Sequence, residues 1–253
     1  MKLYSLYFSP TGGTLKAARL LCSAWSCEVT EVDLSDRSFD TGSLKFEKGD
    51  VCLVSVPSFG GRVPQFIIPK LERMEGNGCR AVIATSFGNR AFDDTLLELK
   101  NTLELHGFVC VGAAAAVTQH SIAPCYGTGR PDADDEKELR DFSAKLKAAA
   151  ESDSAAPVNV PGKYPYKETG KSMIIPAADD KCIRCGICAS RCPVNAIPED
   201  NPTVTDAEKC ISCLQCISIC PQKARSADPA ILKAVEQRLE KVCSERKSNT
   251  LYI

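Results

Sequence analysis

The chain has 253 residues, of which 44% are hydrophobic, and its formal net charge at pH 7 is −1. This length allows one large domain or two modest ones, and the balanced charge offers neither a basic surface for nucleic acid nor an acidic disordered tail. The longest apolar run, residues 108–117, is about half a membrane span, and no signal-peptide pattern begins the chain, so we expect no membrane partner and a cytoplasmic protein.

The chain opens with a phosphate-loop pattern. An apolar run at residues 3–8 predicts a buried strand, and helical spacing follows from Leu15 to Trp25. Between them stands Ser9-Pro10-Thr11-Gly12-Gly13-Thr14. Backbone N–H groups at a helix N-terminus, together with hydroxyls, form an anion cradle. No lysine follows as in a Walker loop, which argues against a nucleoside triphosphate. The alternative is a plain tight turn in which Thr14 caps the helix.

The rest of the first 150 residues alternates strand and helix patterns. We expect strands at 30–34, 51–56, 81–86 and 108–117, and helices at 66–74, 96–103 and 131–147. This alternation predicts an α/β domain with a doubly wound parallel sheet, whose ligand lies at the carboxyl ends of the strands. Three loops leave those ends, at 57–62, 87–90 and 118–130, and the first two place phenylalanine beside glycine. Such pairs suit stacking on a planar ring and close approach of backbone.

The second half is dominated by two cysteine runs. Of the 15 cysteines, eight form Cys182-x2-Cys185-x2-Cys188-x3-Cys192-Pro193 and Cys210-x2-Cys213-x2-Cys216-x3-Cys220-Pro221. This is the bacterial spacing for two [4Fe–4S] clusters, in which the fourth cysteine of each run ligates the other cluster. One set is then Cys182, Cys185, Cys188 and Cys220, and the other is Cys210, Cys213, Cys216 and Cys192. Zinc sites are the alternative. The seven remaining cysteines form no disulfide framework and indicate a reducing, anaerobic cytoplasm.

Composition also divides the chain. The segment at 151–178 is rich in proline and glycine and predicts a linker. Asp228-Pro229 begins a helix, whose stripe of Ile231, Val235, Leu239 and Val242 is expected to pack onto the body of the protein. The predicted parts are therefore a sheet domain at 1–150, the linker, a cysteine domain at 179–227, and a C-terminal helix and tail at 228–253.

These motifs carry a family resemblance. Residues 1–150 resemble a flavodoxin-type FMN domain, with Ser9-x-Thr11-Gly12-x-Thr14 as its phosphate loop. The whole chain, including Gly60-Gly61-Arg62-Val63-Pro64 and Gly129-Arg130-Pro131, resembles the EFR-type family of fused flavodoxin–ferredoxin proteins. The resemblance implies a flavodoxin-like, five-stranded, doubly wound parallel sheet and a small α+β 2[4Fe–4S] ferredoxin-like second domain.

The resemblance also implies which residues hold FMN. The phosphate would lie on Ser9, Thr11, Gly12, Gly13 and Thr14. The isoalloxazine would lie between Pro57, Ser58, Phe59, Gly60 and Gly61 on one side and Ser86, Phe87, Gly88 and Asn89 on the other. Gly13 stands where short flavodoxins commonly carry asparagine, and Phe59 and Phe87 replace their tryptophan or tyrosine.

The predicted function is electron transfer between FMN and two [4Fe–4S] clusters, with redox proteins as partners and no catalytic residue assigned. One alternative is a flavin-dependent reductase of a quinone- or nicotinamide-type acceptor, and another is an FMN-free docking module that carries a ferredoxin. The arginines at 62, 90 and 130, with His120, suggest a cationic rim that would favour an anionic reduced flavin or bind a small anionic acceptor. Solvated loop arginines are the alternative to such a rim.

Overall fold

The computed structural model describes residues 1–152, 156–170 and 174–253. Its first domain is built on a six-stranded sheet of order β2-β1-β3-β4-β5-β8. The strands are β1 (Leu3–Tyr7), β2 (Val29–Asp33), β3 (Val51–Pro57), β4 (Arg80–Phe87), β5 (Val109–Val117) and β8 (Thr250–Tyr252). The first five are parallel, which confirms the predicted sheet, and their order is that of the flavodoxin-like doubly wound fold. β8 pairs antiparallel with β5 and was not predicted.

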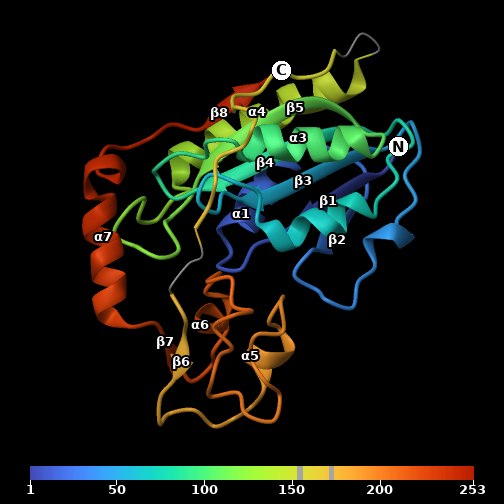
Figure 1. Ribbon diagram of the computed structural model, residues 1–253. Coiled ribbons are helices and arrows are strands. Elements are labelled where there is room, and N and C mark those ends of the chain that lie inside the picture. Colours follow the sequence, from blue (N-terminus) through green and yellow to red (C-terminus); the bar gives the residue numbers. More distant parts are fainter. Residues whose placement is uncertain (153–155, 171–173) are drawn as a thin grey trace.

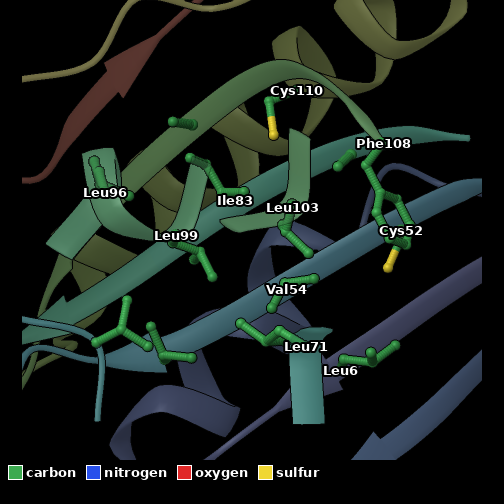
Figure 2. Close-up of a cluster of buried hydrophobic side chains, with 14 of the residues drawn as sticks. Leu6, Cys52, Val54, Leu71, Ile83, Leu96, Leu99, Leu103, Phe108 and Cys110 are labelled. Carbon is green, nitrogen blue, oxygen red and sulfur yellow. The ribbon is translucent and has the colours of Figure 1, made fainter. Parts of the chain in front are cut away.

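Helices cover both faces of this sheet (Figure 1). They are α1 (Gly13–Leu21), α2 (Ile68–Glu72), α3 (Thr95–Leu105) and α4 (Ala133–Glu151), with short 3₁₀ turns at Thr41–Ser43 and Gln65–Ile67. Successive side chains of a strand point to opposite faces of the sheet. On one face, Leu6, Val54 and Ile83 pack against α2 and α3 (Figure 2). Their neighbours, such as Leu3 and Leu53, meet α1 and α4. Each fully buried leucine contributes about 1.5–3 kcal/mol to this packing.

The second domain has little regular structure. It contains β6 (Ala177–Ala178), α5 (Ile187–Ser190), α6 (Gln215–Ser218) and β7 (Arg225–Ser226), and β6 pairs antiparallel with β7. Its buried cluster consists of Cys188, Cys192, Ala189, Ala196 and Ile197. So small an apolar core gives limited stability, and domains of this size depend on metal ligation or similar cross-links.

Part of the expected linker is bound to the sheet domain. The Val158 N–H donates to the Cys110 carbonyl at 2.8 Å, and both Val158 and Val160 are buried in the α2–α3 core. Further along, the N–H groups of Lys163 and Lys167 donate to the Asp94 carboxylate at 2.9 and 2.7 Å. Residues 156–170 therefore form a strap on the sheet domain. Residues 153–155 and 171–173 of that linker lie outside the described residues.

The chain returns to the first domain after the cysteine runs. α7 (Pro229–Cys243) buries Leu239 and Cys243 against Ala123, with Val235 partly buried beside them. The predicted docking of its stripe is therefore confirmed in part, because Val242 is 47% exposed. The following tail is held by the buried Asn89 amide, which donates to the Cys243 and Glu245 carbonyls at 2.5 and 2.9 Å. The cysteine domain is thus anchored on both sides, by the strap before it and by α7 and the tail after it. Among the described helices, none combines the length and the apolar character that crossing a bilayer requires.

Candidate functional site

The two cysteine runs fold alike. Left-handed backbone recurs at positions 28 residues apart: at Arg184 and Ser212 (φ 53° each), Gly186 and Leu214 (75° and 62°), and Asn195 and Lys223 (54° and 50°). Five of these six residues carry a Cβ, so each adopts an uncommon conformation at a cost of about 1–3 kcal/mol. Such turns persist where the surroundings require them, and here they wind each loop around its cysteines.

Backbone donors point at the fourth cysteine of each run. The Ala196 N–H donates to Cys192 Sγ at 3.2 Å, and the Ala224 N–H donates to Cys220 Sγ at 3.3 Å. These are the alanines that occupy equal offsets in the two runs. Hydrogen bonds of this kind stabilise a thiolate and are among the features that set the potential of an iron–sulfur cluster.

Cys210 and Cys216 of the second run pack against the buried Cys188 and Cys192 of the first run. Burial raises the pKa of the Cys213 thiol to about 12, and the nearby thiols of Cys216, Cys192 and Cys210 raise it too. Cys192 comes from the first run and packs beside Cys188 as well as beside second-run cysteines, so the crossed assignment of the fourth ligands stays a prediction.

The first set differs in exposure. Cys188 is buried beside Cys192, whereas Cys185 lies exposed. All 15 cysteines are free of disulfides. Among the described residues, no three His, Cys, Asp or Glu side chains converge as ligands of one metal ion.

The loop after β1 presents unused backbone donors. Gly12 is the N-cap of α1 in a left-handed conformation (φ 88°) and contributes no side-chain cap. In the described part of the chain, the N–H groups of Thr11, Gly13 and Thr14 have no hydrogen-bond acceptor. Because these donors gather at the positive end of a nine-residue helix, the loop suits a phosphate group.

The hydroxyls of Ser9 and Thr14 form hydrogen bonds within the protein that fix the conformation of this loop. Ser9 Oγ accepts from the Leu15 N–H at 2.9 Å. Thr14 Oγ1 lies 2.7 Å from the hydroxyl of Ser86 at the end of β4. The reading of Thr14 as the helix cap is therefore wrong, since its side chain links α1 to β4. A Cβ on Gly13 would stand 3.1 Å from the side chain of Thr118, the residue that follows β5, so Thr118 fills the space where a larger side chain would lie.

The loop after β3 is a tight turn that closes on itself. Phe59 and Arg62 exchange backbone hydrogen bonds of 3.0 and 3.1 Å across Gly60 and Gly61, which both have positive φ. The Phe59 ring is partly buried against Phe8, with ring centroids 6.0 Å apart. This turn is tied to the next loop because the Ser58 N–H donates to the Ser86 carbonyl at 2.8 Å.

The loop after β4 uses its side chains internally. Phe87 is 6% exposed, and its ring packs on Phe92. The His120 ring lies over Gly88, where an added Cβ would approach it to 2.5 Å. Asn89 holds the C-terminal tail, as described above. A flavin bound here would therefore contact the backbone of this loop, because the Phe87 ring and the Asn89 amide are already engaged within the protein.

The cationic rim suggested by the sequence is not formed. Each arginine has a carboxylate partner: Arg62 with Glu98, Arg90 with Asp93 and Arg130 with Asp135. His120 Nδ1 accepts from the N–H groups of Ile122 and Ala123, and burial together with the charge of Arg90 lowers its pKa. Glu98 comes from α3 and Asp135 from the first turn of α4, whereas Asp93 lies three residues after Arg90 in the same loop.

The cysteine domain docks at the carboxyl ends of the strands. Ile211 and Cys213 pack against the α2–α3 core cluster, against which Phe59 also packs. After β2, Arg37 Nη1 donates to Asn195 Oδ1 at 2.5 Å. Figure 1 shows α5 and α6 on this side of the sheet, below the loop that follows β1. The second cysteine set thus contacts the sheet domain.

The sequence interpretation missed one buried residue, Arg225, which is 3% exposed among the cysteines. The 28-residue repeat was the signal that marked it, because Arg225 occupies the position that Ile197 holds in the first run. The first cysteine run carries an apolar residue at this position and the second carries a charged one, so the surroundings of the two cysteine sets differ here.

Comparison with known proteins agrees with the two parts. Residues 175–221 match the 4Fe-4S dicluster domain family. Among curated proteins, no sequence matches this chain. Similar solved structures include a short-chain flavodoxin associated with a non-canonical PDU bacterial microcompartment (17% identity, 60% of this chain and 99% of that one, TM-score 0.46). Another is flavodoxin 1 from Bacillus cereus (16% identity, 58% and 98%, TM-score 0.45).

The strand order, and not these distant similarities, identifies the fold of the first domain. The family match identifies the second as an iron–sulfur domain. The chain joins a flavodoxin-like sheet domain to a 4Fe–4S dicluster domain.

Proposed function

We propose that this protein is an electron carrier in which FMN on the sheet domain exchanges electrons with two [4Fe–4S] clusters in the second domain. The observation that carries the proposal is the packing of Cys213 against the α2–α3 core cluster of the sheet domain, against which Phe59 also packs. Cys213 is a predicted ligand of the second set, and this packing supports a short path between it and a flavin on that domain.

The chain supplies each binding role. The open N–H groups of Thr11, Gly13 and Thr14 would hold the phosphate, and the turn at Gly60 and Gly61 would border the ring. FMN, when bound, accepts electrons in pairs and releases them singly, whereas each cluster carries one at a time. The protein would thus connect two-electron and one-electron reactions.

The exposure of the cysteines suggests the order in which electrons would pass between the flavin and the two clusters. The second set would be proximal to the flavin. The first set would be distal, because Cys185 is exposed. Beside it, Ile183 and Ile187 are 64% and 41% exposed. Apolar side chains around an exposed ligand suit transient contact with a redox partner protein, which we place at this end.

The alternatives have less support. A reductase of a small acceptor would use loop 118–130 as its pocket, but that loop lies under α7: Ala123 packs on Leu239, and the Tyr126 hydroxyl donates to the Glu236 carbonyl at 2.9 Å. An FMN-free docking module would have no use for the open donors of the phosphate loop.

Flash reduction tests the relay. With one electron placed on the flavin of the fully loaded chain, bleaching of the clusters should follow at a rate that does not depend on protein concentration. A rate proportional to concentration would mean transfer between molecules and would contradict the internal route. Addition of a quinone or nicotinamide acceptor to the same sample tests for the reductase activity.

A further inference from the structure

A buried arginine lies between the two cysteine sets. Arg225, in β7, is 3% exposed. Its Nη1 is 3.7 Å from Cys188 Sγ, which belongs to the first set. Burial raises the pKa of the Cys216 thiol of the second set, and the charge of Arg225 acts against that rise. Arg225 thus contacts an expected ligand of one cluster and lies close enough to an expected ligand of the other to favour its thiolate.

Its other partners are neutral. Nη1 donates to the Pro202 carbonyl at 2.5 Å, and Nη2 donates to the Pro176 carbonyl at 2.9 Å and to the Thr205 hydroxyl. Nε has no acceptor in the described part of the chain. No carboxylate among the described residues forms an ion pair with Arg225, in contrast to Arg130, which is also buried and pairs with Asp135. A buried charge without a counter-charge is costly, so this site calls for an anion.

The fold itself does not require a charge at this position. The corresponding residue of the first run, Ile197, is 1% exposed and packs beside Cys188 and Cys192. The equivalent position of the first run is therefore compatible with an uncharged isoleucine side chain. The arginine adds a positive charge to one half of an otherwise matched pair of loops.

We propose that Arg225 is a charge-tuning residue for the iron–sulfur clusters. The anionic, thiolate-ligated clusters would be the counter-charge of its guanidinium. When a cluster takes up one electron from the flavin or an external reductant, its negative charge grows by one, and a buried cation within a few ångström stabilises the reduced form. Arg225 would therefore raise the reduction potentials. This inference rests on the clusters alone and does not depend on the flavin relay.

A redox titration tests the proposal. The full chain is purified anaerobically with its clusters and titrated with mediator dyes, and the reduced clusters are followed by electron paramagnetic resonance. Arg225→Met should shift the midpoint potentials to more negative values, while Arg225→Lys, which keeps the charge, should stay near the unmodified protein. The matched control is Arg191→Gln, which removes one exposed positive charge from the same domain. Unchanged potentials in Arg225→Met, or a shift no larger than that of Arg191→Gln, would overturn the proposal.

Cluster content decides the case in which Arg225→Met fails to assemble. Iron and sulfide are then measured in both variants. Clusters present in Arg225→Lys and lost in Arg225→Met would support a requirement for the charge. Equal loss in both variants would mean that the shape and hydrogen bonds of arginine matter and not its charge, and would overturn the proposal.

Discussion

Replacing Asp135 by Asn should strongly destabilise the sheet domain. Asp135 and Arg130 are an ion pair with side-chain exposures of 1% and 4%. The carboxylate accepts from Arg130 Nε at 2.7 Å, from the Asp132 N–H at 3.0 Å and from Asn249 at 3.0 Å. It therefore joins the start of α4 to the C-terminal tail.

The size of the loss follows from burial. Asp135→Asn leaves the guanidinium of Arg130 buried without its counter-charge, and breaking a buried pair in this way costs about 3–5 kcal/mol. Glu31→Gln is the matched control, because Glu31 pairs with Arg19 in an exposed position, with side-chain exposures of 35% and 61%. Loss of such a pair costs about 0.2–1 kcal/mol.

Chemical denaturation followed by circular dichroism measures both variants on the full chain. The expected result is a clear fall in the free energy of unfolding for Asp135→Asn and almost none for Glu31→Gln. The Asp135→Asn chain should also be cleaved more readily by protease in its C-terminal tail. Equal, small losses in the two variants would refute the reasoning, since the buried pair would then be worth no more than the exposed one.

Three further predictions address the site. Cys192→Ala should lower the iron content from about eight atoms per chain to about four or fewer by removing the second-set cluster. Electron paramagnetic resonance identifies the cluster that remains, and loss of the first-set cluster alone would contradict the crossed ligation. Thr11→Val should weaken FMN binding by about tenfold without changing stability, because this exposed hydroxyl has no hydrogen-bond partner among the described residues. Flavin fluorescence measures the affinity, and an unchanged value would exclude Thr11 as a phosphate ligand. His120 has a pKa lowered by burial and by Arg90, so the unfolded chain binds its proton first as the pH falls below about 6.5 and native stability falls with it. His120→Asn should flatten that fall in pH-dependent denaturation, whereas an identical pH profile would show that His120 does not contribute.

The parts of the fold that local sequence determines were predictable. The five parallel strands are short buried runs between helical patterns, and the cysteine spacing carries the ligand assignment within one segment. β8 was not predictable, because three residues at Thr250–Tyr252 carry no clear strand signal and their partner strand ends over 130 residues earlier. The same holds for Asn89, whose amide hydrogen bonds go to a tail far along the chain.

The predicted cationic rim failed for a related physical reason. The sequence places Arg62 on a loop at the ligand end, but Glu98 becomes its neighbour only when α3 packs against the sheet. Charges on loops are visible in a sequence, whereas their counter-charges on helix faces depend on the tertiary packing. Arg225 is the opposite case, because the internal repeat offered a position-by-position comparison that would have singled it out.

Cofactor analysis of the anaerobically purified chain tests the central claim most directly. The proposed relay predicts about eight iron atoms, about eight sulfides and one FMN per chain, with FMN restored by addition if it is lost during purification. Full iron and sulfide content with no flavin bound, even after FMN is added, would contradict it.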